Sequence, residues 1–325
     1  MADEAADWLQ DKVMGWIPAP PTNKIDTHHH YVPSFYRNGD ASGWPTPSWT
    51  PMWSRLLMRR LGVKTAILSV TAPGAFILEG SASFDLARRL NEYGAQLRNE
   101  EPQRFGFFAS LPSLLDTEAA LAEITYALDT LHADGVTLFT RYGSELNRRK
   151  CVVFIHPTHP VDTTPGNPLL PQPAIDYPHE TTRTAMDMIL QGTRRKFPDT
   201  KVILSHAGGA LPYLITRVAT LMRKAPDFVA AHRMGTTHAQ VMEDFRSFHF
   251  DLALSSTPGV LDLALKMIPH DHILYGSDFP YAPITAYPAF LEDLERYEMS
   301  QKLRDRINYV NALQLIPRLR DKSKC

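Results

Sequence analysis

The amino-acid sequence predicts an α/β fold, a single (β/α)8 TIM barrel. Eight apolar runs of strand length recur along the 325-residue chain, and segments with helical period and polar faces lie between most of them. Strands without a polar face are typical of parallel sheets that helices cover. Eight such units in about 250 residues fit a barrel better than a doubly wound sheet. A doubly wound sheet would place a glycine-rich turn after the first strand, where this chain has His28-His29-His30.

The expected elements alternate in chain order. The strands are Ile25–His30, Thr65–Thr71, Phe105–Leu111, Gly135–Thr140, Val152–His156, Val202–His206, Phe248–Leu254 and Ile273–Asp278. The helices are Met52–Leu61, Phe84–Glu101, Thr117–His132, Glu180–Phe197, Leu211–Lys224, Val260–Ile268 and, after the last strand, Tyr287–Tyr297 and Gln301–Leu315. Residues 1–23 are expected to form an N-terminal extension with a helix at Ala5–Met14, so that the chain 1–325 makes one barrel domain.

Composition limits the class of function. The formal net charge of −1 and the absence of a basic stripe argue against a nucleic-acid partner. The longest apolar runs have strand length, so no membrane span is expected. The first twenty residues are acidic and lack the basic and apolar regions of a secretory signal. The chain has two cysteines, which make no disulfide framework, so the reducing cytosol is the expected compartment.

Two connections that follow strands are long. Tyr31–Lys64 is rich in proline and tryptophan, with Trp44 and Trp53 among them, and Pro157–Pro178 is rich in proline. Because such loops lie on the face where barrel enzymes build their sites, we expect lids over a small apolar substrate, or else a subunit contact. One connection is short, since only Arg141–Cys151 separates the fourth strand from the fifth, near the lower limit for a crossover.

The first strand ends in three consecutive histidines. Side chains of a strand alternate between its faces, so His28 and His30 point the same way and His29 points the other way, toward the helices. Two imidazoles on one face can bind a metal ion, and a surface cluster of histidines gives the same pattern. Asp26 lies on the same face as His28 and is expected either to support the site or to fix the entry of the strand.

Three later strands also end in residues that bind metals. The fifth strand ends in His156, the sixth in His206 and the eighth in Asp278. Because the C-terminal ends of barrel strands meet at one face, these side chains are expected around one point with His28 and His30. Imidazole nitrogens with a carboxylate oxygen suit Zn²⁺, and the same set accepts Mn²⁺ or Fe²⁺. For each histidine alone, a bond to a backbone carbonyl is the ordinary alternative.

These motifs resemble those of the amidohydrolase superfamily. They are Ile25-Asp-x-His-x-His, Phe154-Ile-His-Pro, Leu204-Ser-His-Ala-Gly-Gly and Tyr275-Gly-Ser-Asp-Phe-Pro. Within the superfamily they are most similar to its metal-dependent, cofactor-free decarboxylases, the aminocarboxymuconate-semialdehyde decarboxylase family. Two longer strings resemble most closely the 6-methylsalicylate decarboxylases of that family: Lys24-Ile-Asp-Thr-His-His-His-Tyr-Val-Pro and Leu146-Asn-Arg-Arg-Lys-Cys-Val-Val-Phe-Ile-His-Pro-Thr-His-Pro. The similarity runs from about Lys24 to about Arg318.

The resemblance implies a mononuclear metal site and gives its residues roles. The ligands would be His28, His30, His156 and Asp278, and His206 would be a nearby residue that is either catalytic or adjacent to the metal. Binuclear hydrolases of the superfamily often use a carbamylated lysine at the end of the fourth strand, and no lysine stands there in this chain. The resemblance also implies a homodimer.

The expected activity is the non-oxidative decarboxylation of a small ortho-hydroxy aromatic acid, first of all 6-methylsalicylate, which gives 3-methylphenol and CO₂. A Lewis acid would hold the carboxylate and phenolate oxygens while a proton reaches the ring carbon. Asp278 is the expected proton donor, and His206 would orient it, activate water or hydrogen-bond a substrate oxygen. The alternatives are a metallohydrolase of a lactone or amide on the same site, and a catalytically silent metal-binding barrel, which the short fourth connection would favour.

Several other residues are candidates for contact with the substrate. Arg217 and Arg233 could meet a carboxylate with paired hydrogen bonds, although solvated arginines are commoner. Phe279, Trp44 and Trp53 are candidates for the wall of the pocket or its lid.

Overall fold

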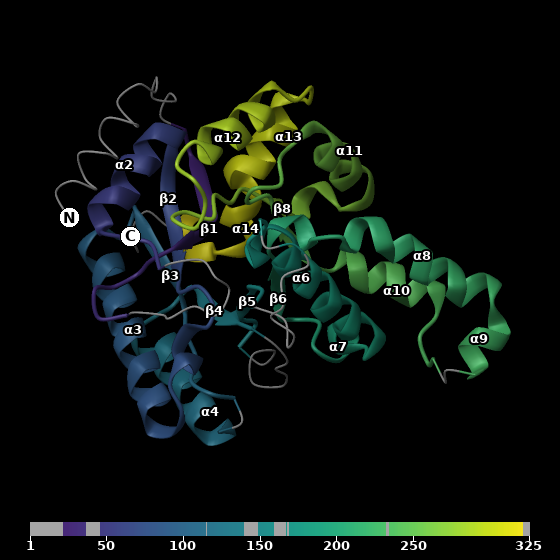
Figure 1. Cartoon of the computed structure of the whole chain (residues 1–325), viewed down its shortest axis with the longest axis horizontal. Helices are drawn as coiled ribbons and strands as arrows, with labels where there is room; N and C mark the ends of the chain where they lie inside the picture. The colour runs from purple at the N-terminus through teal and green to yellow at the C-terminus, as the bar shows by residue number, and fades with distance from the viewer. Residues whose placement is uncertain are drawn as a thin grey trace.

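The computed structural model contains the predicted barrel (Figure 1). It describes residues 22–36, 46–114, 116–139, 149–158, 167, 169–231 and 234–320. Eight parallel strands pair in the order of the sequence. They are β1 Lys24–His30, β2 Val63–Ser69, β3 Phe105–Ala109, β4 Gly135–Leu138, β5 Val152–Ile155, β6 Lys201–Leu204, β7 His249–Asp251 and β8 Ile273–Leu274. The predicted fold class is confirmed.

The chain beyond β8 closes the barrel against β1. The backbone N–H of Thr27 donates to the carbonyl of Tyr275 at 3.0 Å, and the N–H of Asp278 donates to the carbonyl of His28 at 2.8 Å. A parallel bridge joins His29 to Phe279. All seven residues of β1 are buried, although six of them are polar or charged.

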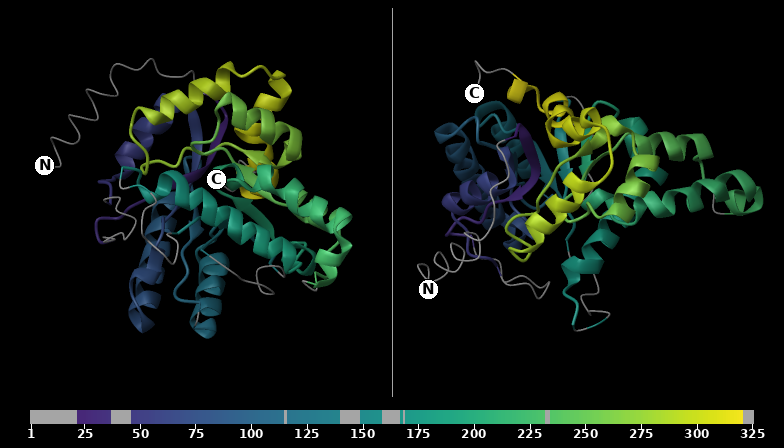
Figure 2. Two further views of the ribbon diagram at one scale, coloured as in Figure 1. Left: turned by 45° about the vertical axis from the view of Figure 1, so that its right-hand side comes forward. Right: turned by 90° about the horizontal axis from the view of Figure 1, so that it is seen from above.

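Helices surround the barrel. They are α2 Pro51–Leu61, α3 Gly80–Glu100, α4 Thr117–Thr125, α6 Gln172–Leu190, α7 Thr193–Lys196, α8 Leu211–Lys224, α9 Pro226–Ala231, α10 His238–Arg246, α11 Pro258–Met267, α12 Ala286–Arg296, α13 Gln301–Asp305 and α14 Asn311–Leu315. Figure 2 shows α8, α9 and α10 projecting from the barrel as an arm. No helix within the described ranges combines the length and the apolar character that a membrane span requires.

Local chemistry sets the helix ends. The hydroxyl of Thr50 accepts the N–H of Trp53 at the start of α2, and Gly62 ends that helix in the left-handed region at φ 68°. The helix predicted over Glu180–Phe197 is corrected at both ends. α6 begins at Gln172, because a proline in the first turn removes no needed donor. It ends at Leu190, since Gly192 at φ 66° separates it from α7.

The connection between β4 and β5 carries no helix in its described residues. A hollow of about 350 Å³ lies against the outward side chains of Leu138, Val153 and Ile155, on the wall that a crossover helix covers in a regular barrel. The helix that the sequence allows at Ser144–Lys150 lies mostly outside the described residues, as does the one expected at Ala5–Met14.

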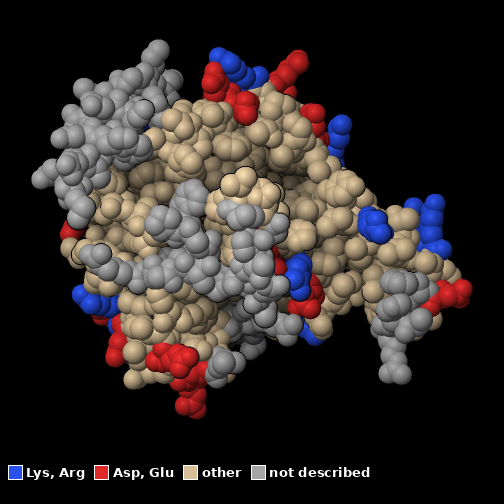
Figure 3. All heavy atoms as spheres, viewed as in Figure 1, with Lys and Arg blue, Asp and Glu red and all other residues tan. Residues whose placement is uncertain are grey.

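Charged side chains are distributed without a field of one sign on the face that Figure 3 shows. Lysines and arginines stand beside aspartates and glutamates around the rim of that face. This mixture agrees with the formal net charge of −1.

Candidate metal centre

Four ligand-type side chains converge at the C-terminal end of the barrel. His28 and His30 come from β1, His156 follows β5, and Asp278 follows β8. One ligand atom of each lies within 4.8 Å of the others, and all four residues are buried. Because the sequence separates them by up to 250 positions, only the convergence of the strand ends brings them together.

Hydrogen bonds fix the tautomers of the three imidazoles. The Nδ1 atom of His28 lies 3.1 Å from Oδ2 of Asp251, that of His30 lies 3.2 Å from the carbonyl of Ser69, and that of His156 lies 2.7 Å from the carbonyl of Pro157. Carbonyl and carboxylate oxygens only accept, so each Nδ1 carries the hydrogen in the neutral ring. Each Nε2 is then left with a lone pair for a metal.

The spacing of these atoms fits a bound ion. Nε2 of His28 lies 3.1 Å from Nε2 of His30, and Oδ1 of Asp278 lies 3.2 Å from the first and 3.1 Å from the second. Two ligands that each stand about 2.1 Å from one ion are roughly 3.0 to 3.4 Å apart. Two nitrogen lone pairs that face each other at this distance repel unless a cation or a proton lies between them. The donor set therefore fits a divalent metal.

The charges of the cluster point to the same conclusion. Burial disfavours a charged His28, yet the carboxylates of Asp251 and Asp278 raise the pKa of its imidazole to about 10. Burial lowers the pKa of His156 well below its usual range, and the neighbouring His30 lowers it further. Burial favours a protonated Asp278, but the histidines around it, above all His28, hold the pKa of its carboxyl well below the usual value. Without a metal, one proton on His28 is thus held between two carboxylates, and a bound cation would replace it.

His206 lies beside the cluster. Its ring centre is 4.9 Å from that of His28, and its Nδ1 lies 3.0 Å from the carbonyl of Ala253. That Nδ1 therefore donates, and the Nε2 of a neutral His206 is an acceptor. His206 borders the same cavity as His156 and Asp278. The geometry gives His206 the position of an acid–base group next to the proposed ligands.

Asp251 contacts the cluster, and the sequence analysis did not single it out. It is fully buried on β7, where Oδ2 faces Nδ1 of His28 and Oδ1 accepts the backbone N–H of His206 at 3.2 Å and of Ala253 at 3.0 Å. A carboxylate behind a ligand histidine fixes the tautomer and the orientation of the ring. An aspartate inside an apolar strand is itself an indication that could have found it.

Asp26 and His29 form a second buried layer. Oδ1 of Asp26 accepts the N–H of His28 at 3.1 Å and of Ser277 at 3.0 Å, and so joins β1 to the segment that carries Asp278. His29 places Nδ1 3.0 Å from Oδ2 of Asp26 and Nε2 2.9 Å from the hydroxyl of Ser54 on α2. His29 thus faces the helices and not the metal cluster.

The cavity beside the cluster has a volume of about 160 Å³. Its wall is largely apolar and is formed by Thr71, His156, Pro171, Pro173, Ala174, Tyr177, His206, Leu254, Asp278, Tyr281, Ala282 and Pro283. No lysine or arginine is among these described lining residues. Four of them belong to the proline-rich segment after β5 and the start of α6, where the sequence predicted a lid.

The family follows from the motifs and from this geometry. The model of the amidohydrolase family matches residues 25–318, which is most of the chain. The chain belongs to the amidohydrolase family. The resemblance that the sequence motifs indicated is confirmed.

Two curated relatives are similar along most of this amidohydrolase. A 6-methylsalicylic acid decarboxylase of Penicillium expansum is 46% identical over 326 residues, covering 93% of this chain and 99% of the relative. One of Aspergillus aculeatus is 46% identical, covering 91% of this chain and 97% of the relative. Since 93% of 325 residues is about 302, the Penicillium alignment holds about two dozen positions without a counterpart here.

A solved structure shares the fold. A dihydroxybenzoic acid decarboxylase from Polaromonas sp. JS666, with bound manganese and the inhibitor 2-nitroresorcinol, superposes with a TM-score of 0.77 at 22% identity. The match covers 93% of this chain and 98% of that one.

Other predicted substrate contacts lie elsewhere in this amidohydrolase. Arg217 is exposed on α8 and does not line the cavity. Phe279 packs with its ring centre 5.1 Å from that of His29, and Trp53 is buried within α2, so neither reaches the cavity. Both were wrong as wall residues. Trp44 and Arg233 lie outside the described residues.

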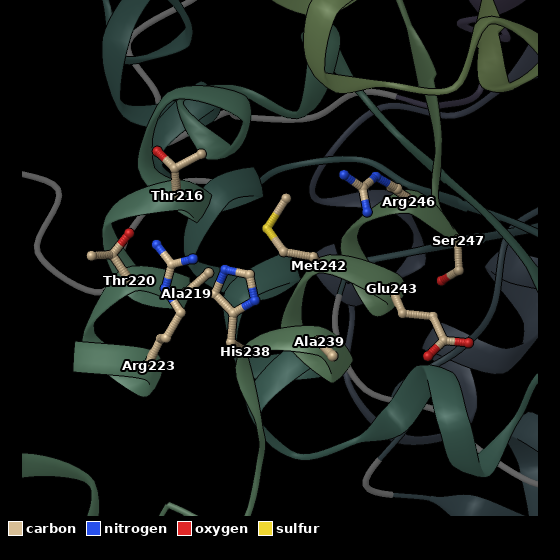
Figure 4. A pocket seen from close by; sticks show the side chains of 10 residues that line it. All are labelled: Thr216, Ala219, Thr220, Arg223, His238, Ala239, Met242, Glu243, Arg246 and Ser247. Carbon is tan, nitrogen blue, oxygen red and sulfur yellow. The ribbon is translucent and has the colours of Figure 1, made fainter. Parts of the chain in front are cut away.

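A larger groove lies away from the cluster, between α8 and α10. It has a volume of about 730 Å³, and Figure 4 shows Arg223, His238, Glu243 and Arg246 along it. It holds one histidine and one carboxylate, too few for a metal site. Size alone therefore does not identify the reactive site in this protein.

Proposed function

We propose that this amidohydrolase is a metal-dependent decarboxylase that converts 6-methylsalicylate into 3-methylphenol and CO₂. The observation that carries the proposal is the convergence of three imidazole nitrogens and Oδ1 of Asp278 beside a cavity of about 160 Å³. A cavity of about this volume holds one benzene ring. The names of the relatives that are 46% identical support the same substrate.

The proposed ligands are His28, His30, His156 and Asp278. Zn²⁺ suits three imidazoles and a carboxylate, and Mn²⁺ is the alternative, supported by the ion in the Polaromonas structure. When bound, the ion supplies positive charge that stabilises the carboxylate and phenolate oxygens of the substrate. Asp251 holds His28 in the tautomer that leaves Nε2 free.

The residues of this chain account for the proton. Asp278 is ionised in the resting site, so it must receive a proton before it can donate one. Nε2 of His206, an acceptor, holds the phenolic O–H when the substrate binds, and that proton then passes to Asp278 as the phenolate forms. Asp278 then delivers the proton to the ring carbon that carries the carboxylate. A pair of ring π electrons forms the new C–H bond; when the bond to CO₂ breaks, its electron pair restores the aromatic ring, and the phenolate regains a proton from solvent.

The apolar wall contributes by excluding water. Proline, alanine and leucine side chains surround the ring position, so the charges of the substrate lie in a medium of low polarity. Loss of CO₂ replaces the localised charge of the carboxylate by the delocalised charge of a phenolate, which a medium of low polarity destabilises less.

Incubation of the metal-loaded protein with 6-methylsalicylate tests the proposal. We expect 3-methylphenol and CO₂ in equal amounts by chromatography and gas analysis, with no organic cofactor added. Treatment with a chelator should stop the reaction, and Zn²⁺ or Mn²⁺ should restore it. If no 3-methylphenol forms, and the protein instead hydrolyses a lactone or amide, the metallohydrolase alternative replaces the proposal. Metal content without turnover on any carboxylic acid would indicate the silent barrel.

The homodimer implied by the resemblance and the single domain 1–325 stay predictions. Sedimentation tests the first, and limited proteolysis tests the second.

A further inference from the structure

Thr71 is a polar residue of the cavity wall that the mechanism above does not use. It follows Ser69, the last residue of β2, by two positions, the spacing that keeps two side chains on one face of an extended chain. The hydroxyl of Ser69 lies 3.1 Å from Nδ1 of His30, so this face of the chain points into the barrel. Thr71 accordingly lines the cavity together with His156, His206 and Asp278.

The hydroxyl of Thr71 has no protein partner among the described residues. The residue is 4% exposed, and its side chain enters none of the hydrogen bonds of the described chain. Because Thr71 lines the cavity, a ligand that fills the cavity can accept a hydrogen bond from this hydroxyl. The position thus offers a donor to whatever molecule fills the cavity.

The charges of the cavity show which part of a hydroxybenzoate needs that donor. The wall carries no lysine or arginine among its described residues, so apart from the proposed ion a substrate carboxylate meets no cation there. His206 presents an acceptor toward the cavity, because its Nδ1–H is bound to the carbonyl of Ala253. An acceptor suits the phenolic O–H of the substrate and does not suit its carboxylate. A carboxylate needs a hydrogen-bond donor, and the hydroxyl of Thr71 offers one in the same cavity.

We propose that Thr71 binds the carboxylate of the substrate through its hydroxyl, as a residue that selects acids over the phenols they produce. This inference rests on the proposed function. Thr71 would donate to a carboxylate oxygen of the acid while the proposed ion supplies the positive charge, so the hydroxyl adds a contact that the acid has and the phenol lacks. The hydrogen bond between Thr71 and the carboxylate is lost when CO₂ departs. The phenol makes no hydrogen bond with Thr71, so this residue does not hold the product.

The variant Thr71→Val tests this role, since valine keeps the shape of threonine and removes the hydroxyl. We expect the KM for 6-methylsalicylate to rise about tenfold or more, because a hydrogen bond to a charged group is lost. Binding of 3-methylphenol, measured by calorimetry on the metal-loaded protein, should change less than twofold. Thr71→Ser, which retains the hydroxyl, should restore most of the affinity for the acid.

The outcomes separate this inference from the proposed function. If the wild-type protein neither binds nor decarboxylates 6-methylsalicylate, the proposed function fails. If the wild type is active and Thr71→Val binds the acid as the wild type does, Thr71 does not contact the substrate. Equal losses for acid and phenol would place the contact on the phenolic oxygen and overturn the proposal. The metal content and the thermal unfolding temperature of both variants should match those of the wild type. If Thr71→Val and Thr71→Ser both lose metal, or both unfold at a lower temperature, Thr71 has a structural role instead.

Discussion

Replacement of Asp251 by asparagine should weaken metal binding, although Asp251 is not a proposed ligand. Its Oδ1 accepts two backbone N–H groups and its Oδ2 faces Nδ1 of His28 at 3.1 Å. An asparagine that keeps its oxygen on the two N–H groups must turn its NH₂ toward His28. Two donors then face each other, and His28 can avoid this only by moving its hydrogen to Nε2, the atom that should bind the metal. The same change of tautomer follows loss of the buried aspartate in serine proteases.

The expected size follows from such partners in other metal sites. Loss of a group that orients a ligand costs about 10- to 100-fold in metal affinity, which is about 1.4 to 2.8 kcal/mol. Competition with a chromophoric chelator measures the affinity of each protein for Zn²⁺. Asp227→Asn, which makes the same chemical change at an exposed position of α9, is the control. An Asp251→Asn protein with the affinity of the wild type would refute the tautomer argument.

Three further predictions concern the cluster and the base of the barrel. His28→Ala and Asp278→Asn should each lower the metal content of the purified protein by elemental analysis, and unchanged content would remove them from the ligand set. A methyl group on Gly276 would lie 2.8 Å from Cβ of His28 and 3.2 Å from Oδ1 of Asp251. Gly276→Ala should therefore lower metal affinity roughly tenfold in the chelator assay. Gly235→Ala, which places its methyl group in open space, should leave the affinity unchanged. Burial, with the neighbouring His272 second, lowers the pKa of the His249 imidazole to about 3, below the value of about 6.5 in the unfolded chain. The unfolded state therefore binds more protons between these values, and the stability present above pH 6.5 should fall by about 2 kcal/mol by pH 5 and further toward pH 3. His249→Phe should reduce this dependence in urea unfolding; an unchanged dependence would contradict it.

The sequence allowed the barrel and the cluster to be predicted because both depend on local patterns. Apolar runs mark the strands, and a ligand-type residue where such a run stops marks the rim, as at His156 and Asp278. Period two along β1 separated His28 and His30 from His29 without any tertiary contact. The convergence of these residues was predictable because the fold class dictates where the strand ends meet.

What could not be predicted depends on contacts between distant segments. Asp251 acts by facing His28 across the barrel, 223 positions away, and nothing near it in the chain announces that partner. The start of α6 was misplaced because the prolines in this part of the sequence indicate a loop. The helix nevertheless contains a proline in its first turn and Pro178 in its interior. Phe279 and Trp53 were assigned to the wall on residue type, while packing directs both away from the cavity.

The backbone at the site shows a feature that residue type conceals. Six described residues other than glycine have positive φ, and four of them follow β6, β7 and β8: His206, Ala207, Leu254 and Asp278. Each such residue costs on the order of 1 to 3 kcal/mol unless its surroundings impose the conformation. Here they do, since Asp251 binds the N–H of His206 and the carbonyl of His28 binds the N–H of Asp278. The left-handed turn lets His206, Leu254 and Asp278 all line one cavity. Glycine would adopt these angles freely but would supply no imidazole, wall or carboxylate, so the chain tolerates the strain where it needs the side chains.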